Sequence, residues 1–120
     1  MENRNLQAIQ KMRKEAALIV DFISGMDFGE FRQDEKTKRA VTQTLANIGE
    51  LENVIDKDFK ARYTQIPWPA IRKTRNIIAH DYISVNFETV WQTAMESIPE
   101  LLTMLEEIEM SEQNEAEYYN

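Results

Sequence analysis

Apolar residues recur every three or four positions along most of this 120-residue chain, and few residues interrupt that pattern. Side chains with this spacing lie on one face of an α-helix, whereas a half-buried strand needs strict alternation. Three glycines and three prolines are too few for the many turns of an all-β fold. We therefore expect an all-α fold, a small up-and-down bundle of about four main helices.

The first half of the chain predicts two long helices joined by a connection. The first covers residues 5–24 and ends at Gly25. The segment GMDFGEF, which begins at Gly25, is expected to be irregular, and Asp34 is a residue type that caps the next helix. The buried stripes of the two helices are expected to contain Ile9, Met12, Ala16, Ile19 and Ile23, and Val41, Leu45, Ile48, Leu51 and Ile55.

The second half predicts two more helices. The segment DKDFKARY forms either a short helix or a loop, and the prolines of QIPWP then break the chain. Pro69 suits the first turn of a motif helix over about residues 68–82. A last helix begins near residue 87 after Asn86, and Pro99 inside it should kink or restart it. Its stripe contains Ile98, Leu101, Leu102, Leu105 and Ile108.

The net charge of −7 is concentrated at the C-terminus. Residues 106–120 hold six of the 21 acidic residues and no basic residue, which leaves 15 acidic against 14 basic residues elsewhere. Net charge therefore does not exclude a nucleic-acid partner. We assign residues 1–110 to the helical domain and residues 111–120 to an acidic tail, expected to be a solvated or frayed end.

The chain has no cysteine, which excludes disulfides, thiolate metal sites and cysteine nucleophiles. The N-terminal segment MENRNLQAIQ lacks the apolar core of a signal peptide, and no apolar run reaches the roughly 20 residues that span a bilayer. We therefore expect a cytoplasmic protein without a membrane partner.

The segment RNIIAHDY, residues 75–82, concentrates polar residues on the motif helix and holds the only histidine of the chain. At 100° per residue, four polar side chains fall on one arc about 140° wide. The small Ala79 lies among them, so the arc predicts a basic groove that is open to close approach. The four residues are Arg72, Arg75, Asn76 and His80.

These residue types suit the cleavage of RNA by internal transfer, which needs a base for the 2′-hydroxyl and an acid for the leaving oxygen. Histidine titrates near neutrality, and arginine offers bidentate donors to a phosphate. A two-fold dimer would bring two copies of His80 and Arg75 into one cleft, so a single histidine is no obstacle. The same residue types also occur in structural networks, and that interpretation stays open.

Neighbouring residues have structural alternatives. Gly49 permits close helix approach, and Glu50 either pairs with Arg75 or Arg72 across the interface or is a plain surface carboxylate. Asp81 is expected to pair with a nearby cation. The residue type of Tyr82 favours amphipathic packing, as Trp68 and Trp91 favour packing in the core or at an interface.

Three segments of the chain resemble segments of the HepT-like family, ribonuclease toxins of the HEPN superfamily, and follow the same order. RNIIAHDY matches that family's R-x4-H-x-Y signature, and LANIGE looks like its I-G-E stretch. IPWPAIRKTRNIIAHDY resembles the block that leads into the motif, and FETVWQTAMESIPELLTML resembles the helix that follows it. The resemblance covers roughly residues 4–108.

The resemblance implies an all-helical homodimer with a composite active site at its two-fold interface. It implies a metal-independent endoribonuclease without a cofactor, the toxin of a type II toxin–antitoxin system, with RNA and not DNA as substrate. The implied partner is an MNT-type minimal nucleotidyltransferase antitoxin that transfers AMP from ATP to the motif tyrosine. The alternative is a non-catalytic helical module that holds a nucleotide or activates a partner nucleotidyltransferase.

Carried across residue by residue, the resemblance makes Arg75 and His80 the catalytic pair and Tyr82 the modified residue. On a helix that continues to residue 82, Tyr82 lies about 10 Å along the axis from Arg75 and 20° around it. Its hydroxyl is then expected at the edge of the groove, within reach of a partner enzyme. The supporting residues are Asn76, Arg72, Asp81 and Glu50.

Overall fold

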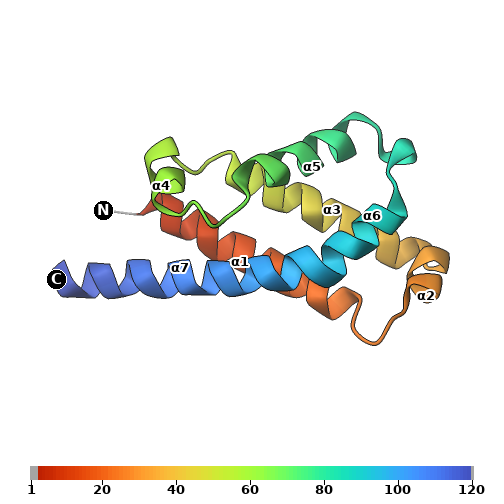
Figure 1. Ribbon diagram of the computed structural model, residues 1–120, viewed down its shortest axis with the longest axis horizontal. Coiled ribbons are helices and arrows are strands. Elements are labelled where there is room, and N and C mark those ends of the chain that lie inside the picture. The colour runs from red at the N-terminus through yellow and green to blue at the C-terminus, as the bar shows by residue number, and fades with distance from the viewer. Residues whose placement is uncertain (1–2, 120) are drawn as a thin grey trace.

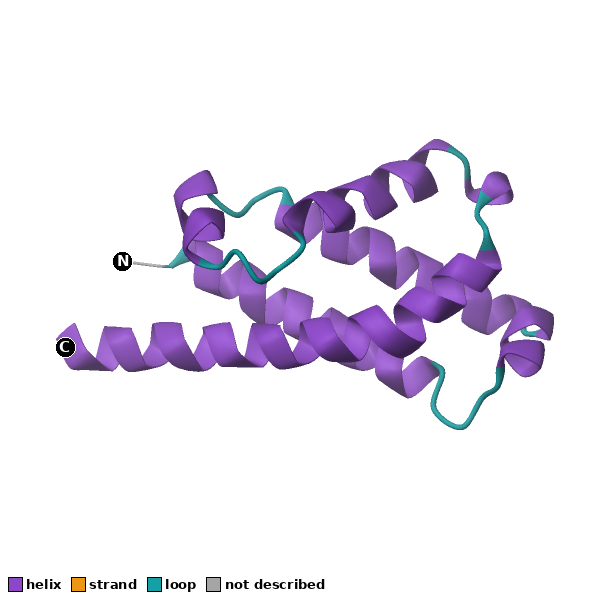
Figure 2. Cartoon of the chain, viewed as in Figure 1, coloured by secondary structure: helices purple, strands orange, loops and turns teal. Residues whose placement is uncertain are grey.

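The computed structural model describes residues 3–119, and side chains up to residue 115. Most of that stretch is helical, and it contains no strand (Figure 2). The prediction of an all-α fold is therefore confirmed. The elements are α1 (Arg4–Phe22), α2 (Phe28–Gln33), α3 (Glu35–Glu52), α4 (Lys57–Arg62), α5 (Trp68–His80), the 3-10 turn η1 (Tyr82–Ser84), α6 (Phe87–Gln92), the π-helical segment η2 (Thr93–Ser97) and α7 (Ile98–Tyr119).

Helix α1 lies at the centre of the bundle, because it packs against α3 on one side and α7 on the other. Helix α5 packs on α3 and has few contacts elsewhere, so α5 forms an edge of the molecule (Figure 1). The expected apolar stripes supply most of the buried core, including Ile9, Met12, Ile19, Val41 and Leu105. The arrangement leaves one long face of the motif helix uncovered.

Two tryptophans pack as expected. Trp68 is 6% exposed, and its indole nitrogen donates to the carbonyl oxygen of Tyr63 at 3.1 Å. Trp91 stacks on Phe31, with ring centroids 5.1 Å apart. Both rings therefore hold helices together.

The connection expected after Gly25 contains a helix, α2, so that prediction was wrong. Asp27 accepts a hydrogen bond from the backbone N–H of Glu30 at 2.8 Å, and Glu30 accepts one from the backbone N–H of Asp27 at 3.1 Å. This reciprocal capping box satisfies two donors that a short helix otherwise leaves free. The side chain of Phe31 is fully buried and anchors the turn to the core.

The other expected helix boundaries are largely confirmed. Asp34 caps α3 by accepting from the backbone N–H of Thr37 at 3.0 Å, and Asn86 caps α6 in the same way. The segment DKDFKARY contains helix α4 and not a loop. The π-helical segment η2 ends two residues before Pro99, which has no N–H to donate to the α-helical ladder.

The motif helix ends at His80, two residues earlier than expected. Asp81 leaves the helix with φ −157°, and its carboxylate accepts from the backbone N–H of Ile83 at 3.1 Å. The same carboxylate accepts from the hydroxyl of Ser84 at 2.6 Å. Because Asp81 offers the backbone a competing partner, it starts η1 in place of another helical turn. Tyr82 therefore does not lie on α5, and the helical angle expected for it was wrong.

The acidic C-terminal segment is also ordered differently from expectation. Helix α7 continues through Tyr119, and Glu112 is only 7% exposed. Glu112 accepts a hydrogen bond from the Tyr63 hydroxyl at 2.6 Å. Burial and this carboxylate raise the pKa of Tyr63 above its ordinary value. The hydrogen bond therefore holds Glu112 against the residue that follows α4. The division of the chain into a domain and a C-terminal tail stays a prediction.

No helix in the described range 3–119 combines the length and the apolar character needed to cross a membrane.

Gly49 sets the distance between α3 and α5. A Cβ atom at this position would lie 2.8 Å from Cγ of Arg75 and closer still to its Cβ, with the carbonyl oxygen of Ile71 at 3.3 Å. Such distances are shorter than van der Waals contact, and a backbone cannot yield as a flexible side-chain end can. Glycine is therefore required where the motif helix crosses α3, as the sequence suggested.

We predict that Gly49→Ala lowers the free energy of unfolding by about 2 kcal/mol, because the added methyl group pushes α5 away from α3. Urea denaturation measures this loss. The control is Gly29→Ala, where the nearest atom, Oδ1 of Asp27, lies at an ordinary 3.4 Å. That variant should be neutral or slightly more stable. Equal losses in both variants would contradict the close-approach argument.

Candidate active site

Arg75 is turned toward α3 and is held there by an ion pair. Its Nε donates to Oε1 of Glu50 at 2.6 Å, and Nη1 donates to Oδ1 of Asn76 at 3.1 Å. The pairing interpretation of Glu50 is confirmed. The side chains of Arg75 and Glu50 are 39% and 57% exposed, so solvent weakens their attraction. The ion pair therefore orients the guanidinium of Arg75 more than it stabilises the fold.

Arg72 is held by a carboxylate that the sequence analysis missed, Glu52. The Glu52 side chain is fully buried, and its Oε1 accepts from Nη2 of Arg72 at 2.8 Å and from Nζ of Lys60 at 2.7 Å. Glu52 occupies a position of the apolar stripe, four residues after Ile48. A charged residue at a core position was the signal that could have revealed this pair.

Two opposing effects act on the pKa of Glu52. Burial alone raises the pKa of this carboxyl, but the hydrogen bonds from Arg72 and Lys60 outweigh burial, and the net pKa lies below the ordinary value of 4.5. The carboxylate form is therefore the one that the fold stabilises.

His80 lies at the C-terminal end of α5, on its uncovered face. It lines a shallow hollow of about 400 Å³ together with Arg72 and Asn76. Ile77 lies in the same hollow and is 51% exposed. Three of the four residues of the expected arc thus share one open surface.

Arg75 lines a different pocket, which measures about 510 Å³ and lies between α3 and α5. Ala79 and Tyr82 line this second pocket, so Ala79 is not the floor of the His80 hollow. The expected single groove is therefore divided by the ridge of α5. The hydrogen bond from Arg75 to Asn76 connects the two sides.

The ring of Tyr82 packs against neighbouring side chains, and its hydroxyl is not exposed to solvent. Its ring meets Phe87 edge-on with centroids 5.9 Å apart, and the guanidinium of Arg39 lies 5.1 Å from the ring centre. The hydroxyl is buried and has no hydrogen-bond partner among the described residues. The packing interpretation is confirmed, and the expectation of an accessible hydroxyl at the groove edge was wrong for this conformation.

Asp81 caps η1 through the contacts given above and pairs with no cation in the part of the chain that the structure describes. The hydrogen bond from the Ser84 hydroxyl is the main cause that holds its pKa below the ordinary value of 3.8. The expected ion pair of Asp81 was therefore wrong, and its carboxylate instead ends the motif helix.

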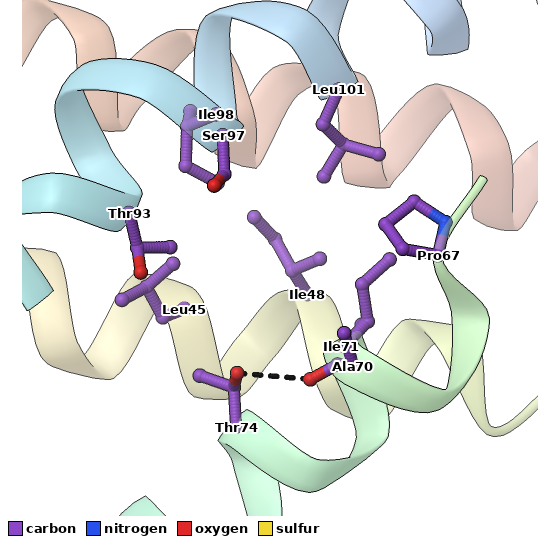
Figure 3. Close-up of a pocket in the computed structure, with 10 residues that line it drawn as sticks. All are labelled: Leu45, Ile48, Pro67, Ala70, Ile71, Thr74, Thr93, Ser97, Ile98 and Leu101. Atoms are coloured by element: carbon purple, nitrogen blue, oxygen red, sulfur yellow. Dashed lines mark hydrogen bonds between the residues drawn. The ribbon is translucent and has the colours of Figure 1, made fainter. Parts of the chain in front are cut away.

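A third cavity, of about 270 Å³, lies between α3, α5 and α7 and is mostly apolar (Figure 3). Ile48, Ile71 and Leu101 point into it, and the hydroxyl of Thr74 turns back to the carbonyl oxygen of Ala70 at 2.9 Å. None of the motif's ionisable side chains lines it. In addition, no three acidic, histidine or cysteine side chains in the described range are grouped as metal ligands are.

The amino-acid sequence matches a known protein family over most of its length. The sequence profile described as ribonuclease HepT-like matches residues 12–108. The chain therefore belongs to the ribonuclease HepT-like family, as the ordered motifs suggested.

Individual relatives agree with this assignment. A protein of Methanocaldococcus jannaschii named "Putative RNase" is 36% identical over 90 residues, which cover 75% of this chain and 74% of its own. One of Caldanaerobacter subterraneus, also named "Putative RNase", is 29% identical over 83% of this chain and 89% of its own. "Probable ribonuclease HepT" of Thermococcus cleftensis is 31% identical over 90% of this chain and 98% of its own. No solved structure was found to match the chain.

We predict that Glu52→Gln lowers the free energy of unfolding at pH 7 by about 2–3 kcal/mol, because it leaves Lys60 and Arg72 without their counter-charge. Since the folded pKa of Glu52 is depressed, its contribution is present above pH 4.5 and is lost as the pH falls through the folded pKa. The difference in the free energy of unfolding between the wild type and Glu52→Gln should therefore become smaller at acidic pH. Denaturation at several pH values measures it.

The matched control is Glu35→Gln, which removes a carboxylate from the same helix. Glu35 also pairs with two cations, Lys38 and Arg39, but its side chain is 60% exposed. Solvent screens such a pair, so the control should lose much less stability. A loss as large as that of Glu52→Gln would refute the buried-charge explanation.

Proposed function

We propose that this chain is a metal-independent endoribonuclease that acts as the toxin of a type II toxin–antitoxin system in the cytoplasm. The observation that carries the proposal is the uncovered face of α5. There His80, Asn76 and Arg72 share one hollow, and Arg75 is linked to them through Asn76. Family membership supports RNA as the substrate.

The proposed reaction transfers a phosphodiester within the RNA chain. One His80 takes the proton of a 2′-hydroxyl, whose oxygen attacks the neighbouring phosphorus. The bond to the 5′-oxygen breaks, and a second His80 returns a proton to that oxygen. The guanidinium of Arg75 stabilises the negative charge that builds up on the non-bridging oxygens of the phosphate. The pair with Glu50 keeps this guanidinium oriented before RNA arrives.

The second histidine comes from a second copy of the chain, so we propose a homodimer with its two-fold axis near α5. This helix is covered on one side only, and its exposed face mixes polar groups with the half-exposed Ile77. Ile83, in the turn η1 that follows the helix, is 91% exposed. Such a face buries apolar surface when a copy of itself packs against it. Two symmetric hollows then combine into one cleft.

We predict that His80→Ala and Arg75→Ala each reduce RNA cleavage by a factor of roughly 10²–10⁴, because each removes a group that acts only in the transition state. A fluorogenic RNA assay measures the loss, and circular dichroism checks the fold. Lys36→Ala, an exposed residue outside both pockets, is the control and should cleave at the wild-type rate. Cleavage by His80→Ala at the wild-type rate would exclude this site.

The same assay tests metal independence. Purified protein should cleave equally well with and without EDTA, and loss of cleavage in EDTA would overturn the metal-free mechanism. The alternative, a non-catalytic module that holds a nucleotide, predicts no His80-dependent cleavage at all.

We further propose that an MNT-type nucleotidyltransferase neutralises the toxin by modifying Tyr82. The phenol oxygen attacks the α-phosphorus of ATP, pyrophosphate leaves, and the phenol proton passes to solvent. A phosphodiester then adds negative charge close to Arg75, where it competes with RNA phosphates for the cation. Because the hydroxyl is buried, η1 must open for the transfer.

We predict that Tyr82→Phe stays fully toxic to a bacterial host and is no longer neutralised by the transferase, because the ring and its packing remain while the acceptor oxygen is gone. Growth assays and mass spectrometry measure the two effects. Tyr118→Phe is the control and should be modified and neutralised as the wild type is. An AMP group mapped to Tyr118 or Tyr119 would contradict the assignment of Tyr82.

A further inference from the structure

The pocket between α3 and α5 contains residues that the proposed cleavage reaction does not use, including Arg39 and Gln43. Its volume of about 510 Å³ exceeds that of the His80 hollow. Its lining combines apolar residues such as Ala46 and Ile78 with polar and charged ones, which are Arg39, Thr42, Gln43, Glu50, Arg75 and Tyr82. A pocket of this size can hold a small ligand, and two guanidinium groups favour an anionic one.

Tyr82 is one of the residues that line this pocket, and its hydroxyl is unusual. It is buried, and no described residue forms a hydrogen bond with it. A buried hydroxyl without a partner costs free energy, and proteins rarely leave one in place without a functional reason. The unpaired hydroxyl therefore marks a position where the unmodified chain lacks a hydrogen-bonding or covalently attached group.

Arg39 is the cation best placed to meet a group attached to this hydroxyl. Its guanidinium lies over the Tyr82 ring, 5.1 Å from the centroid, and its only ion pair in the described residues is with Glu35, one turn earlier. The Arg39 side chain is 64% exposed, so that pair is weak and easily exchanged. Arg72, by contrast, is bound to the buried Glu52 and lies in the other hollow.

We propose that this pocket receives the nucleotide that Tyr82 carries after modification, with Arg39 as the partner of its phosphate. The inference rests on the proposed modification of Tyr82 and adds the place where the attached nucleotide is bound. Arg75, on the opposite wall, exchanges its pair with Glu50 for the same phosphate. Neutralisation then removes the guanidinium of Arg75 from catalysis in addition to blocking RNA.

A weak pocket is sufficient for this purpose. A nucleotide fixed to Tyr82 by one covalent bond has an effective concentration in the millimolar range, so millimolar affinity for the free nucleotide already keeps the pocket occupied. The free nucleotide should consequently bind measurably to the unmodified protein. This gives a test that does not depend on any transferase.

The test is a titration of the isotope-labelled, unmodified protein with free AMP, followed by NMR. Amide signals of α3 around Arg39 and Gln43 and of residues near Tyr82 should shift and saturate at millimolar AMP. Arg39→Ala should weaken binding about tenfold, the order expected for one hydrogen bond to a charged group. The control Lys36→Ala removes an exposed cation from the same helix outside the pocket and should bind as the wild type does.

Two outcomes would overturn the proposal. One is the absence of any localised shift, and the other is a set of shifts confined to the Arg72 and His80 hollow and unchanged by Arg39→Ala. Adenosine without phosphate serves as a second ligand, and it should bind equally poorly to wild type and Arg39→Ala. If the titration succeeds but the transferase never modifies Tyr82, the proposed neutralisation fails while the nucleotide pocket stands.

Discussion

The contact between Gly49 and Arg75 is the constraint on which the rest of the structure depends. It brings the backbone of α3 against the root of an arginine side chain, at a distance that excludes even a methyl group. Since α5 has few contacts outside α3, this crossing decides where the whole motif helix lies. The geometry of the proposed site is therefore set by a residue that takes no part in its chemistry.

Two carboxylates on α3 add ion pairs to the close contact that Gly49 allows between α3 and α5. Glu50 follows Gly49 directly and binds Arg75, and Glu52 lies three residues after Gly49 and binds Arg72. The exposed pair with Glu50 orients Arg75, which has to exchange this carboxylate for a phosphate. The buried pair with Glu52 anchors Arg72, which keeps its partner. The difference in burial thus assigns different tasks to two arginines that look equivalent in sequence.

The fold followed from the sequence because apolar spacing determines helices over long segments, as in α1 and α7. Local hydrogen bonds caused the errors: the capping box of Asp27 built α2, and Asp81 ended the motif helix before Tyr82. The sequence offered a pair of Glu50 with Arg75 or Arg72 as one of two interpretations, but it did not indicate that α5 divides the basic arc. Which side of a helix faces a neighbour depends on tertiary packing, which a helical wheel does not contain.

The central claim is that two copies of His80 act in one cleft. It is tested most directly by unfolding wild type and His80→Ala together, refolding them at several ratios, and measuring cleavage by the mixed dimers. If each cleft needs both histidines, activity falls as the square of the wild-type fraction. A linear decrease would show that every protomer cleaves RNA alone, and would contradict the composite site.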